Sequence, residues 1–142
     1  MKFHLIIKYY ADLSNKDLIN RICNIAEKNH KITCCHRDLE EWGLKSFSIN
    51  ELMEKAFEFI DNCDALIVEF TNGGFGVAIE TGYAKAKNIP IYVLTSKGKD
   101  LLSISTPMKG TCNACFEYET DDDIQSIFNK ISEDNGGFQQ LK

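Results

Sequence analysis

The chain has 142 residues, of which 44% are hydrophobic and 26% are charged, and its formal net charge at pH 7 is −5. This length and balance predict one soluble domain with one core, located in the cytoplasm. The acidic charge argues against a nucleic-acid polymer as partner, because phosphate backbones require a basic surface. No apolar run approaches the roughly 18 residues that a membrane-spanning helix needs, so we expect no membrane association.

The first half of the chain begins with an apolar run over Phe3–Tyr10, which predicts a strand. Over Asn15–Asn29, apolar residues repeat about every 3.6 positions, as on one face of a helix. Lys31–Cys35 is expected to form a short second strand. A serine–glutamate capping box opens the next helix, which is expected over 48–62.

The second half continues the alternation. Asp64–Phe70 predicts a third strand and Val77–Lys87 a helix. Ile89–Leu94 predicts a fourth strand. Cys115–Tyr118 predicts the fifth strand, and a last helix is expected over Asp121–Ile131.

Five strands that alternate with helices predict a parallel sheet covered on both faces. Right-handed crossovers favour a single doubly wound α/β domain over residues 1–142, of the flavodoxin-like or Rossmann-like kind. The polar tail from Ser132 is expected to be frayed. Two long loops, His36–Phe47 and Thr95–Thr111, follow strands, so both are expected at the carboxyl edge of the sheet, where ligands of such folds bind.

Six cysteines are spread along the chain, and Cys112 and Cys115 have the spacing of half a zinc site. There is no second pair of this kind, and neither His30 nor His36 lies at a finger-like distance from this one. The N-terminal residues lack the apolar length and cleavage site of a signal peptide. We therefore expect reduced thiols, no metal and no cofactor.

The segment Cys63–Leu94 holds the feature with the most chemical content. An apolar strand leads into the glycine turn Gly73–Gly76 and then into a helix with Glu80, expected in its first turn. Such an arrangement suits a polar ligand, but a tight turn needs none, and this one does not match GxGxxG. Glu80 has two interpretations. Its negative charge near the helix N-terminus either only stabilises the helix through the dipole, or is kept ionised there so that the carboxylate can act as a nucleophile or base.

Three motifs in this segment resemble the nucleoside 2-deoxyribosyltransferase family. They are Glu69-Phe70-Thr71, Phe75-Gly76-Val77-Ala78 and Glu80-Thr81-Gly82-Tyr83-Ala84. The branch that the chain resembles most is that of the 2′-deoxynucleoside 5′-monophosphate N-glycosidases, which carry Glu-Val-Thr, Leu-Gly-Val-Gly and Glu-Leu-Gly-x-Ala. The similarity extends to Lys31–His36 and to Leu101-Leu102-Ser103, and so covers nearly the whole chain.

The resemblance implies a reaction at the N-glycosidic bond of a small-molecule nucleoside or nucleotide. The glutamate that matches Glu80 attacks the anomeric carbon and forms a covalent glycosyl-enzyme, which water or a second nucleobase resolves. The resemblance places His36 by the nucleobase. It also implies a homodimer, with Ser103 near the phosphate of the neighbouring subunit's ligand and with Phe57 or Tyr83 buried between the subunits.

Four sites depart from the family pattern. Ala56 stands where the family has a second carboxylate, and Gly74 where it has the serine that holds the 5′-phosphate. Ile7-Lys8 replaces a glycine–serine pair, and His4 replaces a tyrosine. Because a methyl group cannot transfer a proton, acid assistance to the leaving base must come from elsewhere or be absent.

Three functions stay open on these grounds. The first is an N-glycosidase or deoxyribosyltransferase; the second is a catalytically degenerate nucleotide-binding module of the same fold; the third is an unrelated flavodoxin-like regulatory or interaction domain. Lys8, Lys97 and Lys99 either replace the missing phosphate contacts or are solvated surface charges. Glu80 is the candidate catalytic residue. The candidate binding residues are His4, Lys8, His36, Asn72, Gly73, Gly74, Gly76 and Ser103.

Overall fold

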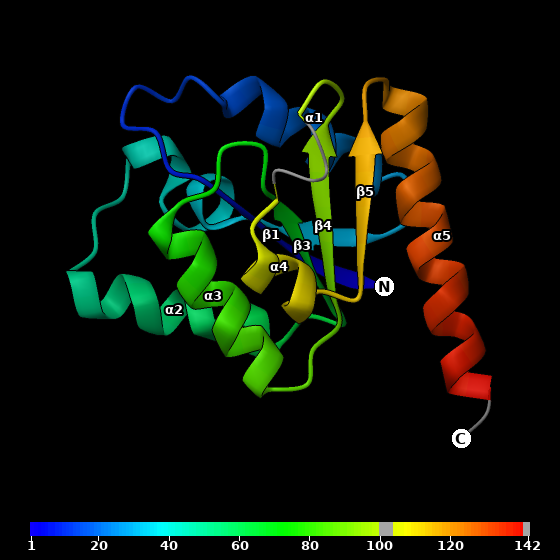
Figure 1. The fold of residues 1–142 in the computed structure, drawn as a ribbon. Coiled ribbons are helices and arrows are strands. Elements are labelled where there is room, and N and C mark those ends of the chain that lie inside the picture. The colour runs from blue at the N-terminus through cyan, green and yellow to red at the C-terminus, as the bar shows by residue number, and fades with distance from the viewer. Residues whose placement is uncertain (100–103, 141–142) are drawn as a thin grey trace.

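The computed structural model describes residues 1–99 and 104–140, and it confirms the predicted α/β fold. A five-stranded sheet lies at its centre in the order β2-β1-β3-β4-β5, and every pair of neighbouring strands is parallel (Figure 1). The strands are β1 (Lys2–Ile7), β2 (Lys31–Thr33), β3 (Ala65–Glu69), β4 (Ile91–Ser96) and β5 (Ala114–Tyr118).

Helices follow each strand. The α-helices in the described part of the chain are α1 (Lys16–Ala26), α2 (Ile49–Asp61), α3 (Phe75–Ala86), α4 (Thr106–Thr111) and α5 (Asp121–Gln140). A π-helical turn, η1 (Cys35–Leu39), and a short 3₁₀ turn, η2 (Glu41–Gly43), occupy part of the long loop predicted after β2. α4 likewise lies within the loop predicted after β4.

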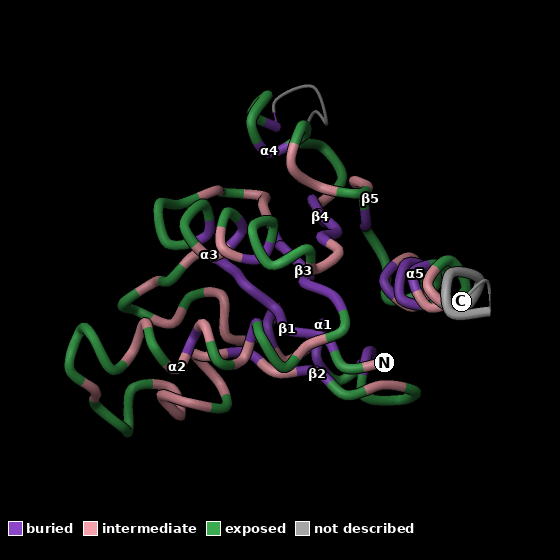
Figure 2. Tube along the Cα trace, turned by 90° about the horizontal axis from the view of Figure 1, so that it is seen from below, coloured by how far each residue is buried: buried purple, intermediate pink, exposed green. Residues whose placement is uncertain are grey.

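The sheet separates two apolar clusters. α1 and α5 pack on one face, where Ile22 and Phe128 are fully buried, and α2, α3 and α4 pack on the other around Ile60 and Val77. Buried residues therefore concentrate along the strands and on the inward sides of the helices (Figure 2). Each such large side chain stabilises the fold by roughly 1.5–3 kcal/mol, so the sheet is a rigid support for the residues at its edge.

The division of helices between the two faces also fixes where a ligand can bind. β1 leads to α1 on one face, whereas its neighbour β3 leads to α3 on the other, and Ile7 at the end of β1 pairs with Glu69 at the end of β3. Open α/β sheets bind ligands at such a switch point, outside the carboxyl ends of the strands.

One predicted boundary is wrong in a way that affects the site. α3 begins at Phe75, two residues before the predicted start, because Gly74 with φ 135° is its N-cap. This value lies in the region that favours glycine, so the helix starts directly after the glycine turn.

The predicted end of the last helix at Ile131 is also wrong, because α5 continues through Ser132 to Gln140, and the fraying of this tail stays a prediction. Its polar residues are tied down: the Ser132 hydroxyl donates to the Phe128 carbonyl at 2.8 Å, and the Asn135 amide donates to the Tyr92 hydroxyl at 3.0 Å. Within residues 1–99 and 104–140, no helix has the length and apolar character needed to cross a membrane.

Candidate functional site

Two cavities lie on either side of the end of β1. The larger, of about 600 Å³, contains Glu80 and lies between β1, η1, α2 and α3. The smaller, of about 370 Å³, lies towards α1 and β5. Ile7 and Lys8 line both cavities, so the two meet at the switch point of the sheet. We take the larger cavity as the candidate active site because it holds the candidate nucleophile.

Each wall of the larger cavity contributes a different chemical group. The chain after β1 supplies Lys8, and the π-helical turn η1 supplies Cys35 and His36. α2 supplies an apolar wall that includes Ala56, and α3 supplies Glu80. A carboxylate, an imidazole, a thiol and an amine therefore surround a space large enough for a nucleoside.

Glu80 is the sixth residue of α3 and lies in its second turn, not in the first as predicted. The helix dipole acts mainly within the first turn, so it does little to favour the charge of this carboxylate. Burial instead raises the pKa of Glu80 to about 7. The expectation that the helix N-terminus keeps the group ionised is therefore wrong, because desolvation outweighs the dipole.

A carboxyl group with this pKa has both forms populated at neutral pH. Among the described residues, none donates a hydrogen bond to the Glu80 carboxylate or forms an ion pair with it. A poorly solvated, unpaired carboxylate is a stronger nucleophile and base than one in water. The surroundings of Glu80 thus suit chemistry better than they suit a structural role.

The same burial predicts that Glu80 destabilises the fold at alkaline pH. Its folded-state pKa of about 7 lies above the ordinary value of 4.5, so the folded state disfavours the ionised form. The cost is absent below about pH 4.5, grows as the pH rises to about 7, and then stays near about 3 kcal/mol.

Glu80→Gln should therefore raise the free energy of unfolding by about 1–3 kcal/mol at about pH 8, and by nothing measurable at about pH 4. Urea denaturation at the two pH values measures this difference. Glu54 is exposed and serves as the matched control, since Glu54→Gln should change neither value. Equal stability of wild type and Glu80→Gln at about pH 8 would contradict the burial argument.

His36 and Glu40 form a second titratable group on the cavity wall. His36 Nδ1 lies 3.3 Å from Glu40 Oε2, and His36 Nε2 lies 3.3 Å from the carbonyl oxygen of Ile7. The ring also packs against Tyr9, with 5.3 Å between ring centroids. Both ring nitrogens therefore lie within hydrogen-bonding distance of an oxygen acceptor.

His4 lies beneath the cavity wall. Its ring is fully buried, stacks on Phe59 at 5.4 Å between centroids, and has Nδ1 2.7 Å from the Thr33 hydroxyl oxygen. Burial lowers the pKa of His4 to about 4, so the ring is neutral. His4 lines neither cavity and reaches the larger one only through Cys35, whose Sγ lies 3.9 Å from Nε2. Its predicted contact with substrate stays a prediction.

The residues of the glycine turn and the preceding Asn72 line different cavities. Gly74 and Gly76 line the larger cavity beside Glu80. Asn72 lines the smaller one, and Asn72 and Gly73 also line a third cavity of about 270 Å³. Ser103, the remaining predicted binding residue, lies outside the described residues.

Lys8 lies directly across from the glycine turn. A Cβ built at Gly74 would lie 3.6 Å from Lys8 Cγ, and Lys8 Nζ lies 5.3 Å from the centroid of the Tyr10 ring. The lysine stem therefore contacts the position where the family pattern has its phosphate-binding serine. Lys8 thus brings a cationic side chain to the turn at Gly74, where the serine hydroxyl of the family pattern is missing.

The residues of the larger cavity that sequence reasoning missed include Glu40, Cys35 and Phe75. Glu40 is four residues from His36 and so shares its side of a helical turn, a spacing that was available in the sequence. Nothing in the sequence distinguishes Cys35, as a cavity residue, from a cysteine buried in the core. Phe75 was assigned to the family loop motif and not to the cavity, although it lines the cavity while remaining 93% exposed.

No cluster of three or more metal-ligating side chains occurs among residues 1–99 and 104–140. The Sγ atoms of Cys112 and Cys115 lie 3.4 Å apart. The pair supplies two of the four ligands that a structural zinc ion takes.

Known proteins share this fold, although no protein-family model and no curated protein matches the chain. CMP N-glycosidase BcmB of Clostridium botulinum is 16% identical, with 93% of this chain and 98% of that chain covered and a TM-score of 0.59. A 2-deoxyribosyltransferase of Bacillus psychrosaccharolyticus is 13% identical, with 88% and 90% covered and a TM-score of 0.63. A conserved protein of Enterococcus faecalis is 15% identical, with 91% and 97% covered and a TM-score of 0.67.

These identities are low, so the likeness concerns the fold, and it extends over most of both chains in each comparison. Two of the three proteins are named for reactions of nucleosides or nucleotides. The chain shares its fold with a CMP N-glycosidase and with a 2-deoxyribosyltransferase, in agreement with the fold that the sequence resemblance implies.

Proposed function

We propose that the protein cleaves the N-glycosidic bond of a nucleoside or nucleotide, with Glu80 as the nucleophile. One observation carries the proposal: the unpaired, poorly solvated carboxylate of Glu80, with a pKa near 7, on the wall of a nucleoside-sized cavity at the switch point of the sheet. Two proteins with this fold, a CMP N-glycosidase and a 2-deoxyribosyltransferase, support the choice of bond.

In the proposed reaction, a carboxylate oxygen of Glu80 bonds to C1′ of the sugar while the bond from C1′ to the base nitrogen breaks. The bonding electrons leave with the base, which takes up a proton. Water then attacks C1′, gives up a proton, and releases the sugar and the Glu80 carboxylate. If a second base attacks in place of water, the same intermediate leads to transfer.

The leaving base needs a proton, and we assign its supply to His36. Glu40 and the Ile7 carbonyl orient its ring, which lines the same cavity as Glu80. Ala56, which stands where the family has a carboxylate, also lines the cavity but has no proton to give. The pair of His36 and Glu40 takes over this role.

The substrate class that best fits is a nucleoside 5′-monophosphate. Lys8 lines the larger cavity, and its stem packs beside Gly74, where the family serine binds the 5′-phosphate. An ammonium group compensates phosphate charge more strongly than a hydroxyl does, so Lys8 replaces the missing contact.

Restoring the family carboxylate should raise the rate. Ala56 is only 3% exposed and lines the same cavity as Glu80, so the carboxyl group of Ala56→Asp would be held protonated by burial and able to donate to the base. We expect Ala56→Asp to speed base release from ordinary bases at least about tenfold, and from activated leaving groups much less.

Initial rates of base release, followed by chromatography, test this prediction. Ala56→Asn has the same size and no acidic proton, and it should bring no gain. If Ala56→Asp and Ala56→Asn behave alike on poor leaving groups, the assignment of missing acid assistance to position 56 is wrong.

We also propose that the protein is a homodimer that associates through the outer face of α3. Phe75 and Ile79, one helical turn apart, are 93% and 57% exposed, and Phe75 extends from the rim of the Glu80 cavity. A second subunit on this face would cover both side chains and close the cavity. Phe57 and Tyr83, the residues expected in the interface, stack on each other within one chain at 4.2 Å between ring centroids.

Phe75→Glu combined with Ile79→Glu should convert the dimer to a monomer, because each carboxylate would have to be buried in the interface. Sedimentation velocity measures the change. Leu44 is 85% exposed and lies outside α3, so Leu44→Glu is the control and should leave the dimer intact. A monomeric wild type at the highest concentrations studied would refute the proposal.

A nucleotide-binding module without catalysis is the second candidate. The observation that favours it is Ala56, which removes the carboxylate of the family from the cavity wall. A panel of nucleosides and nucleotides distinguishes the two functions, since only the enzyme releases free base. Thermal shift with the same panel detects binding in either case.

A further inference from the structure

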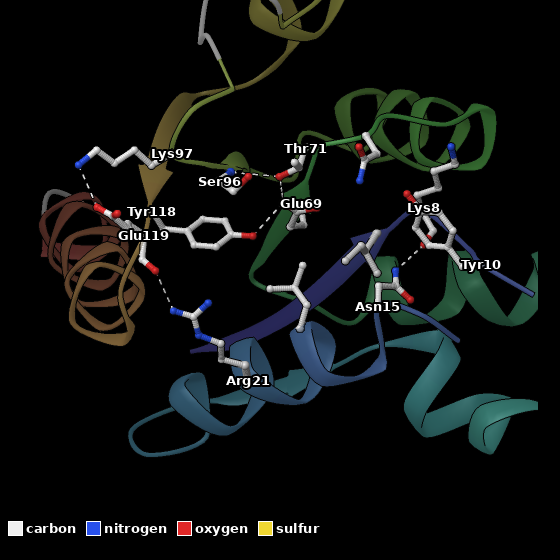
Figure 3. Close-up of a pocket in the computed structure, with 13 residues that line it drawn as sticks. Lys8, Tyr10, Asn15, Arg21, Glu69, Thr71, Ser96, Lys97, Tyr118 and Glu119 are labelled. Carbon is white, nitrogen blue, oxygen red and sulfur yellow. Dashed lines mark hydrogen bonds and ion pairs between the residues drawn. The ribbon is translucent and has the colours of Figure 1, made fainter. Parts of the chain in front are cut away.

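The smaller cavity is separate from the site of the proposed reaction. It lies across the end of β1 from Glu80, among the carboxyl ends of β3, β4 and β5 and the residues of α1 (Figure 3). It shares only Ile7 and Lys8 with the larger cavity. The proposed glycosidase reaction uses none of its remaining residues.

A buried carboxyl group, that of Glu69, lines this cavity. Glu69 is 3% exposed, and its Oε1 accepts hydrogen bonds from the Tyr118 hydroxyl at 3.0 Å and from the Thr71 hydroxyl. Figure 3 shows the Tyr118 ring extending from β5 toward this carboxyl group. Both hydroxyls use Oε1, so within the described residues no side chain donates to Oε2.

The position of Glu69 is costly for stability. It ends a strand whose other residues are apolar, and burial raises the pKa of its carboxyl group. An apolar side chain there would avoid the desolvation cost. Thr71 is fixed in turn, because its hydroxyl oxygen accepts from the Ser96 N–H at 3.0 Å. An oriented acceptor in a cavity is the kind of group that recognises ligand hydroxyls.

The rim of the same cavity carries two cations, Arg21 and Lys97, that are held in place by carboxylates. Arg21 Nε lies 2.5 Å from Asp121 Oδ1, and Arg21 Nη2 donates to the Glu119 carbonyl at 3.0 Å. Lys97 Nζ donates to Glu119 Oε2 at 2.9 Å. A guanidinium group has five N–H donors, so most of those of Arg21 are not used by these two bonds. Three cations, those of Lys8, Arg21 and Lys97, line the cavity against the carboxyl groups of Glu69 and Glu119.

We propose that this cavity binds a small phosphorylated sugar of about the size of a pentose phosphate, with sugar hydroxyls on Glu69 and the phosphate on Arg21 and Lys97. The volume of about 370 Å³ accommodates such a molecule. The acceptor lies inside the cavity and the cations lie at its rim, so a ligand with hydroxyls at one end and an anion at the other matches both. This site does not depend on the proposed reaction at Glu80.

Calorimetry on the full chain with ribose 5-phosphate tests the proposal, with inorganic phosphate and ribose titrated separately. Ribose 5-phosphate should bind at least about tenfold more tightly than either of its parts, because it engages both ends of the cavity. Arg21→Gln should weaken its binding at least about tenfold. Lys28→Ala removes an exposed cation outside the cavity and should bind as wild type does.

A further variant locates the ligand. Glu69→Gln keeps the shape and an acceptor oxygen but removes the carboxyl group, so it should bind more weakly than wild type while its melting temperature reports the fold. Binding by Arg21→Gln and Glu69→Gln as tight as that of wild type, binding of inorganic phosphate as tight as that of ribose 5-phosphate, or no heat of binding at millimolar ligand would each overturn the proposal.

Discussion

Glu80→Gln should reduce kcat/KM for base release by about 10⁴-fold or more, because an amide cannot attack the anomeric carbon. Glutamine keeps the size of the side chain, so the cavity keeps its shape. The initial rate of base release from the most reactive substrate of a nucleotide panel measures the loss.

The stability prediction for the same variant separates lost chemistry from lost structure. Glu80→Gln should be more stable than wild type at alkaline pH, since it removes a carboxylate whose pKa burial has raised to about 7. An inactive variant that is also more stable identifies Glu80 as functional. The exposed Glu54 is the control, and Glu54→Gln should keep the full rate. A Glu80→Gln variant within about tenfold of the wild-type rate would exclude Glu80 as nucleophile.

The rate should fall steeply in mild acid. Only the ionised form of Glu80 attacks, and its pKa is about 7. Below that value the ionised fraction falls about tenfold per pH unit, so kcat/KM at about pH 5 should be about 100-fold below its alkaline plateau.

A substrate with an activated leaving group is the right probe for this profile, because it needs no acid and its rate reports Glu80 alone. Circular dichroism at each pH checks that the fold persists, and the Glu80 contribution to stability increases as the pH falls. If the rate instead falls only around pH 4.5, the ordinary pKa of a glutamate side chain, Glu80 is solvated when it reacts.

Much of the fold follows from local patterns in the chain. Apolar or aromatic runs predicted every strand, and alternation with helical stripes predicted the parallel sheet. The errors lie where local signals are weak. The tail after Ser132 is polar, and what keeps it helical includes the bond from Asn135 to Tyr92, 43 residues away in sequence. No local pattern reports such a contact.

Part of the candidate site could also be predicted from the sequence, and part could not. The structure brings Lys8, His36, Gly74 and Gly76 to one cavity with Glu80, so a motif and its flanks were sufficient to group them. The raised pKa of Glu80 was not predictable from its place near a helix start, because burial decides it. The hydrogen bond between Glu69 and Tyr118 could not be predicted from the sequence either, because it joins two strands at residues 49 positions apart.

The apolar face of α2 illustrates a limit of pattern reading. Leu52, Met53 and Ala56 carry the 3.6-residue periodicity of a core face, and all three also line the cavity beside Glu80. A face that packs on a protein core and a face that packs on a nucleobase have the same composition. Only the position of the neighbouring elements tells them apart.

The most direct measurement is chromatography of a long incubation of the wild-type protein with a panel of 2′-deoxynucleosides, ribonucleosides and their 5′-monophosphates. If Glu80 acts as proposed, at least one 5′-monophosphate releases its free base, and Glu80→Gln under the same conditions releases none. If no base appears from any member of the panel while a nucleotide raises the melting temperature, the protein is a binding module and the enzymatic proposal is wrong.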